Sequence, residues 1–230
     1  MAEIYLIGTY HFDPNGPSRL KRTLEEIGPQ LILLEGNELK DKGRQIYKRL
    51  VKSELELKKA DRNLIEAVSE KGKTLGYEYE IALQFASLHQ TSLDYFNDVV
   101  DYPNMHQNKV EARGYVRSLI KHKITARKIL SEIKDAERSS NQKWNSLKLV
   151  EETEKEKIFA YPDSSNGFSV AFNPKRDIIM KKVLRDHDSS NRYNRIATIT
   201  GFSHIVRDPD RRTLYSKIED LHPTRKFLYA

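Results

Sequence analysis

Two histidines near opposite ends of the chain follow the same kind of segment. His11 lies three residues after Gly8, which ends an apolar run, and His204 lies three residues after Gly201, which ends another. A third apolar run leads directly into Glu35. We interpret the three runs as buried strands of an α/β sheet, and ligands of such sheets bind at the carboxyl ends of the strands. The pattern therefore predicts that one acidic and two imidazole side chains meet at one sheet edge.

These three residue types suit metal-assisted hydrolysis. Neutral imidazole binds divalent metals, and a carboxylate adds an oxygen ligand and negative charge. A metal held by His11, Glu35 and His204 would lower the pKa of bound water and polarise a carbonyl group. Mn, Co and Zn are the candidate ions. Other interpretations stay open at this point: the histidines can act as metal-free general bases or as hydrogen-bonding residues, and Glu35 can cap a following helix.

The composition excludes several classes of protein. None of the 230 residues is cysteine, which excludes a thiol nucleophile, a disulfide framework and a cysteine-ligated zinc site. No apolar stretch approaches the roughly 18 residues of a membrane span, and the start of the sequence has no hydrophobic leader. We expect a cytoplasmic protein without a membrane span.

The order of segments predicts one α/β domain over residues 1–230. Its mostly parallel central sheet is flanked by helices, as mixed strands and helices at this spacing favour. Residues 1–36 are typical of one βαβ unit. A helical insertion is expected over about residues 39–157, with its basic part at 106–148.

The basic part suggests a different function. Residues 106–148 contain eleven Lys and Arg against four Asp and Glu, and this excess equals the +7 net charge of the whole chain. Arg113, Arg117 and Lys121 recur every four residues, so they share one helix face. A non-enzymatic module that binds nucleic acid or an acidic partner through this face is an alternative; a solvated helix face explains the same spacing.

Several segments resemble the TraB/PrgY–GumN–Tiki superfamily, in the order that the family has them. The likeness lies in the following pieces: the Gly8–His11 and Gly201–His204 motifs, the segment 31–36, Gly76-Tyr77-Glu78 with Ala82 and Ala86, and Arg176-Asp177-x-x-Met180. The chain departs from the family at Asp94-Tyr95, where relatives have Asp-Arg, and at Lys175, where an acid is common. The resemblance implies the α/β fold of erythromycin-esterase and ChaN-like proteins.

For the Tiki branch, the resemblance implies a metal-dependent peptidase. By position, His11 and His204 become metal ligands, Glu35 a ligand or general base, and Arg176 a cation that binds substrate or stabilises an oxyanion. Residues that would contact substrate or support the ligands are Gly8, Thr9, Glu78, Gly201 and Ser203. We therefore expect a metal-dependent hydrolase of peptide or amide bonds with a peptide or small-molecule substrate. A metal-free esterase-like hydrolase and a protein that sequesters peptides without turnover remain alternatives.

Overall fold

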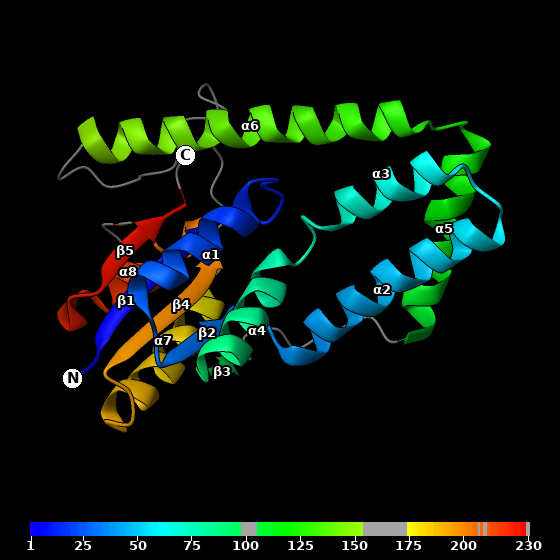
Figure 1. The fold of residues 1–230 in the computed structure, drawn as a ribbon. Helices are drawn as coiled ribbons and strands as arrows, with labels where there is room; N and C mark the ends of the chain where they lie inside the picture. Colours follow the sequence, from blue (N-terminus) through cyan, green and yellow to red (C-terminus); the bar gives the residue numbers. More distant parts are fainter. Residues whose placement is uncertain (98–104, 154–173, 207, 209–210, 229–230) are drawn as a thin grey trace.

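A five-stranded parallel sheet forms the centre of the protein (Figure 1). The computed structural model describes residues 1–97, 105–153, 174–206, 208 and 211–228. The strands are β1 (Glu3–Thr9), β2 (Leu31–Leu34), β3 (Ser92–Tyr95), β4 (Arg195–Gly201) and β5 (Thr224–Phe227), in the spatial order β3-β2-β4-β1-β5. Every neighbouring pair is parallel. The predicted fold class, a mostly parallel sheet flanked by helices, is confirmed.

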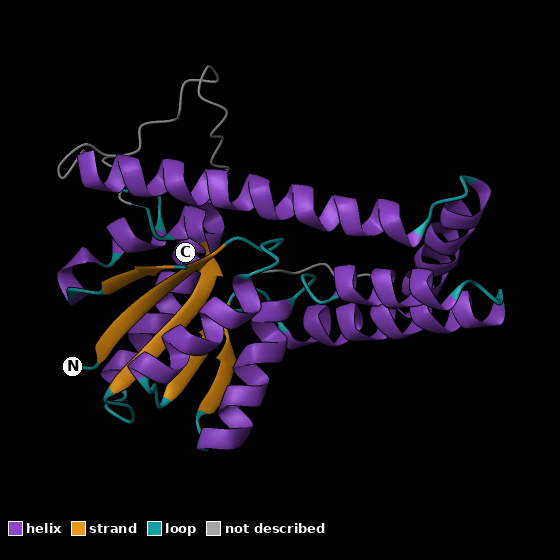
Figure 2. Ribbon diagram, turned by 45° about the horizontal axis from the view of Figure 1, so that its top comes forward, coloured by secondary structure: helices purple, strands orange, loops and turns teal. Residues whose placement is uncertain are grey.

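Helices cover both faces of the sheet because its strands are apolar on both sides (Figure 2). On one face, Ile7 and Ile32 pack with α1 (Gly16–Ile27) and α4 (Tyr77–His89). On the other, Leu6 and Leu33 pack with α7 (Pro174–Ser189) and α8 (Leu214–Lys217). Two short 3-10 turns, Phe202–His204 and Glu219–Leu221, complete this part of the chain.

Four further helices form an arm that extends away from the sheet (Figure 1). They are α2 (Glu38–Leu57), α3 (Arg62–Gly72), α5 (Met105–Lys121) and α6 (Ala126–Thr153). The arm has an apolar core of its own, which includes Val51, Leu55, Val116 and Ile129. The long α6 returns toward the sheet, where Trp144 joins the core beside α1 and α4. Among the described helices, none is long and apolar enough to cross a membrane.

Two features differ from the sequence-based picture of the chain. β1, α1 and β2 form the expected βαβ unit, but β4 lies between its two parallel strands, an order that the sequence did not indicate. Within the range 39–157, α4 and β3 belong to the sheet region, because β3 pairs with β2 and α4 packs on α1. The insertion therefore consists of two separate helical pieces, and its expected last residues, 154–157, lie outside the described part of the chain.

Candidate active site

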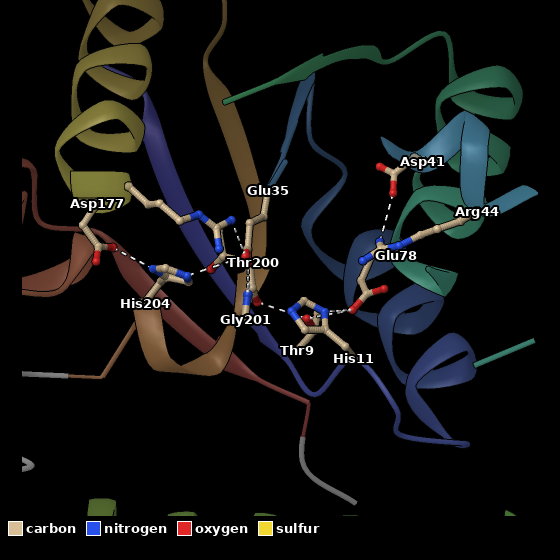
Figure 3. Close-up of polar contacts among 11 residues, drawn as sticks. Thr9, His11, Glu35, Asp41, Arg44, Glu78, Asp177, Thr200, Gly201 and His204 are labelled. Carbon is tan, nitrogen blue, oxygen red and sulfur yellow. Dashed lines mark hydrogen bonds and ion pairs between the residues drawn. The ribbon is translucent and has the colours of Figure 1, made fainter. Parts of the chain in front are cut away.

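The site lies at the carboxyl edge of the three central strands, β2, β4 and β1 (Figure 3). In the parallel register, Thr9 is the partner of Gly201, and Leu34 is the partner of Ile199. Glu35 follows β2 and its backbone nitrogen donates to the Ile199 carbonyl over 3.0 Å. The insertion of β4 between β1 and β2 thus brings the two histidine-bearing segments and Glu35 to one place.

His204 is buried on the 3-10 turn that follows β4, with only 7% of its side chain exposed. Its Nδ1 lies 2.8 Å from Asp177 Oδ1 at the start of α7, and its Nε2 lies 3.6 Å from Glu35 Oε1. Burial favours the neutral ring, but the contacts with Asp177 and Glu35 outweigh it and raise the pKa of His204 to about 9. In this arrangement His204 is therefore protonated at neutral pH.

His11 belongs to the loop after β1, and 43% of its side chain is exposed. Its Nδ1 lies 2.6 Å from Glu78 Oε1, a carboxylate in the first turn of α4. Desolvation opposes a charged ring, yet the Glu78 contact raises the pKa of His11 above its ordinary value. The Thr9 hydroxyl lies 3.1 Å from both Glu78 Oε1 and the Thr200 carbonyl, so it helps to fix the carboxylate against β4.

The loop that carries His11 is tied to α6. The Asp13 carboxylate is fully buried and accepts hydrogen bonds from Arg19 and from the Trp144 indole, at 2.8 and 3.0 Å. Lys143 Nζ donates to the Tyr10 hydroxyl over 2.7 Å. A long helix of the arm thus holds the segment on either side of His11.

Glu35 sits between the two imidazoles as an ionised carboxylate. The Gly201 backbone nitrogen donates to its Oε2 over 2.5 Å, and Arg176 Nη2 donates to its Oε1 over 2.6 Å. Burial alone would raise the pKa of Glu35, but His204, then His11 and Arg176, hold it well below its ordinary value. Glu35 is therefore negatively charged at neutral pH.

Gly201 leaves the space that these groups share. A Cβ atom there would lie 3.3 Å from His11 Nε2, 3.5 Å from Glu35 Oε2 and 3.8 Å from His204 Cδ2. The backbone at Gly201 has φ −56° and ψ 140°, which other residues also adopt. The glycine is thus needed for room rather than for its conformational freedom.

The remaining predicted site residues divide into two groups. Arg176, Thr9 and Glu78 are brought to the site by the contacts given above. Gly8 is a packing position, because a Cβ there would lie 2.6 Å from Ile205 Cδ1. Ser203 lies on the turn before His204 and is half-buried; within the described residues its side chain has no hydrogen-bond partner.

The donor types fit a divalent metal. Each imidazole has its Nδ1 beside a carboxylate, Glu78 or Asp177, which is how metal-binding histidines are commonly held so that Nε2 faces the metal. Glu35 supplies an oxygen between the two rings. As the side chains stand, with Arg176 on Glu35, no group of three acidic or imidazole residues in the described chain has the spacing of a metal site.

Sequence reasoning missed three charged groups around this site. Asp177 was part of a recognised motif but was given no role, although its place in the first turn of a helix next to Arg176 was a usable signal. Arg44 and Asp41 lie on α2, where Arg44 Nη1 donates to Asp41 Oδ1 over 3.1 Å and Arg44 reaches toward Glu78 (Figure 3). Burial raises the pKa of Asp41 to about 6.

The basic residues singled out for nucleic acid lie on α5, in the arm. Arg113 Nε donates to Glu54 Oε1 over 2.8 Å, so its charge is partly neutralised. Arg117 and Lys121 line a shallow hollow together with Lys58 and His122. None of the three contacts the residues around Glu35 within the described structure.

The fold and the site together define an α/β protein with a charged histidine–carboxylate cluster at the carboxyl edge of a parallel sheet. Comparison of the chain with protein-family models, with curated proteins and with solved structures found no match.

Proposed function

We propose that the protein is a hydrolase of peptide or amide bonds that uses a divalent metal held by His11, Glu35 and His204. The observation that carries the proposal is the shared orientation of the two imidazoles. Both place Nδ1 beside a carboxylate, and both have their other edge beside Gly201, where Glu35 also lies. The resemblance to the TraB/PrgY–GumN–Tiki superfamily supports the choice of a peptide or amide bond.

The residues of the chain would divide the work as follows. A bound metal supplies an acidified water and a polarised carbonyl. Asp177 and Glu78 fix the tautomer and the angle of the two rings, and the Gly201 nitrogen orients the carboxylate of Glu35. Arg176, which pairs with Glu35, would supply a positive charge to stabilise the negative charge that develops on the carbonyl oxygen in acyl transfer.

Metal binding tests this proposal without relying on turnover. Isothermal titration of purified protein with Mn²⁺, Co²⁺ or Zn²⁺ should show one site, which His11→Ala and His204→Ala abolish. Asp177→Asn should weaken affinity by roughly 10–100-fold, because it removes the negative charge of the group that orients His204. His122→Ala, an exposed histidine on the arm, is the matched control and should bind metal normally.

Two results would contradict the proposal. One is that none of the three ions binds or stabilises the protein. The other is that His11→Ala and His204→Ala bind metal as tightly as His122→Ala does, which would locate the metal elsewhere.

A metal-free hydrolase is a second candidate, favoured by the 2.6 Å contact of Arg176 with Glu35 and by the raised pKa of both histidines. In this reaction the Glu35 carboxylate would accept a proton from the attacking water, a protonated imidazole would donate one to the leaving group, and Arg176 would stabilise the oxyanion. Turnover that persists in chelator and disappears in Arg176→Gln would support this candidate. A metal-dependent enzyme would lose turnover in chelator and regain it on addition of metal.

The non-enzymatic alternative uses Arg113, Arg117 and Lys121 to bind nucleic acid or an acidic partner. Such binding must weaken steeply with salt. Charge reversal of these residues should then abolish retention of nucleic acid; unchanged retention would exclude them as the contact surface.

A further inference from the structure

A row of positive side chains runs along α2 from the candidate site into the arm. Lys40, Arg44, Lys48 and Lys52 recur every four residues, so they lie along one side of the helix. At about 1.5 Å per residue, the row spans about 18 Å. Figure 1 shows α2 leading from the sheet edge into the arm.

The near end of this row lies at the site. Lys40 Nζ would be 3.8 Å from a Cβ at Gly36, the residue after Glu35. Its ammonium group has no hydrogen-bond or ion-pair partner in the described structure, and burial lowers the pKa of Lys40. Arg44 comes next, donates to Asp41 and reaches toward Glu78, the partner of His11 (Figure 3). A desolvated, unpaired cation therefore stands next to the proposed reaction centre.

The far end of the row lines a hollow between α2, α3 and α5. Its volume is about 480 Å³, and its walls are mostly apolar, with Val51, Val68, Leu75 and Tyr115 among them. Phe12, which follows His11 in the loop after β1, also lines it and is 57% exposed. The loop that carries His11 therefore also borders the hollow.

Basic residues outnumber acidic ones around the hollow. Five Lys and Arg line it against a single acid, Glu80. Three of the five are paired: Lys48 with Glu80, Lys71 with Glu132 and Lys73 with Glu70. Arg49 and Lys52 have no ion-pair partner among the residues that the structure describes. A mostly apolar hollow with two unpaired cations beside it complements a ligand that has both apolar and acidic groups.

We propose that this row and hollow bind an extended acidic peptide, with one bulky apolar side chain in the hollow and acidic side chains along α2. The inference rests on the proposed function, since it names the substrate class of that site. An extended peptide covers about 3.3 Å per residue, so the row accommodates about five or six residues. The apolar walls favour a peptide over nucleic acid, whose backbone offers charge but no apolar side chain.

Binding can be measured apart from catalysis. Wild-type protein in chelator is titrated into a fluorescent peptide of alternating glutamate and leucine, and anisotropy is recorded at two salt concentrations. Matched peptides replace glutamate with lysine, or leucine with serine. We expect the glutamate–leucine peptide to bind, and both replacements to weaken binding by roughly tenfold or more.

Two charge-reversal variants locate the surface. Lys48→Glu with Lys52→Glu should weaken binding of the glutamate–leucine peptide by roughly tenfold, because like charges then face each other. Arg117→Glu with Lys121→Glu changes the net charge equally, on α5 outside the hollow, and should leave binding unchanged. Thermal melting checks that both variants fold. If the double variant does not fold, the single variant Arg49→Glu takes its place, since Arg49 is exposed and lines the same hollow, and it should also weaken binding of the glutamate–leucine peptide.

Each outcome separates this inference from the proposed function. Equal weakening by the two double variants, or equal binding of all three peptides, would overturn the inference even if metal-dependent turnover is found. Stronger competition by a single-stranded oligonucleotide than by the unlabelled peptide would overturn it in favour of nucleic acid. Peptide binding that depends on Lys48 and Lys52 would uphold it even if no metal binds.

Discussion

Replacing Gly201 with alanine tests whether the reaction centre lies in the space beside this residue. The backbone at Gly201 suits alanine, and Gly→Ala at such a position stabilises a protein by about 0.4–1 kcal/mol through the unfolded chain. The added methyl would lie 3.3 Å from His11 Nε2, closer than most Cβ contacts, which offsets part of that gain. We expect the free energy of unfolding to change by less than about 1 kcal/mol.

The functional loss should be far larger than the change in stability. The methyl would occupy the region that His11, Glu35 and His204 share. We expect metal affinity to fall by at least about tenfold and turnover to fall with it, because the methyl group takes up part of the space between the three ligands and disturbs their placement. Titration calorimetry measures the first, and hydrolysis of a chromogenic amide measures the second.

Gly114→Ala is the matched control for this variant. Apart from the neighbouring backbone of α5, no atom of the described residues lies within 4 Å of a Cβ at Gly114, so α5 should gain stability while metal affinity stays the same. The reasoning fails if Gly201→Ala is folded and keeps metal affinity and turnover within about twofold of wild type. It also fails if Gly114→Ala loses metal affinity as Gly201→Ala does.

Three further predictions concern stability. In chelator, the protonated His204 ring should contribute to the free energy of unfolding because its pKa is raised in the folded state. The contribution, about 3 kcal/mol at most, is complete below pH 6.5 and disappears as pH rises through about 9. Urea unfolding across this range should show the loss in wild type and a smaller one in Asp177→Asn; equal pH profiles would contradict it. Burial raises the pKa of Asp41, so the free energy of unfolding decreases as pH rises from 3.8 through about 6. At pH 7, Asp41→Asn should therefore unfold at a higher urea concentration than wild type. A lower urea midpoint for the variant would show that the contact of Asp41 with Arg44 outweighs the cost of burial. Leu55→Ala, fully buried in the arm, should destabilise by about 2–5 kcal/mol in the same assay, and a change below about 1 kcal/mol would mean that the arm core repacks or that the arm unfolds separately.

The sheet and its edge were predictable because they depend on local patterns. Short apolar runs that end in a glycine or an acid identify β1, β2 and β4 in the sequence. Parallel strands present their carboxyl ends at one edge, so His11, Glu35 and His204 could be grouped before any coordinates were known.

The spatial order of the strands could not be predicted in the same way. β4 pairs with β1 and β2 across more than half of the chain, and no local signal specifies that pairing. The carboxylate partners of the two histidines also differ in how far the sequence could predict them. Glu78 lay in a recognised motif and was assigned a supporting role, whereas the contact of Asp177 with His204 depends on how α7 packs against the turn after β4.

The contacts between α6 and the loop after β1 have a consequence for how this chain can change over evolution. Asp13 is fully buried; removal of Arg19 would leave its charge without an ion pair, and removal of Trp144 would leave it one hydrogen bond short. Substitutions at positions 137–144 should therefore be accompanied by substitutions at positions 10–19 in an alignment of related sequences. We expect the helical arm and the sheet to have diversified together, rather than as parts that were exchanged independently.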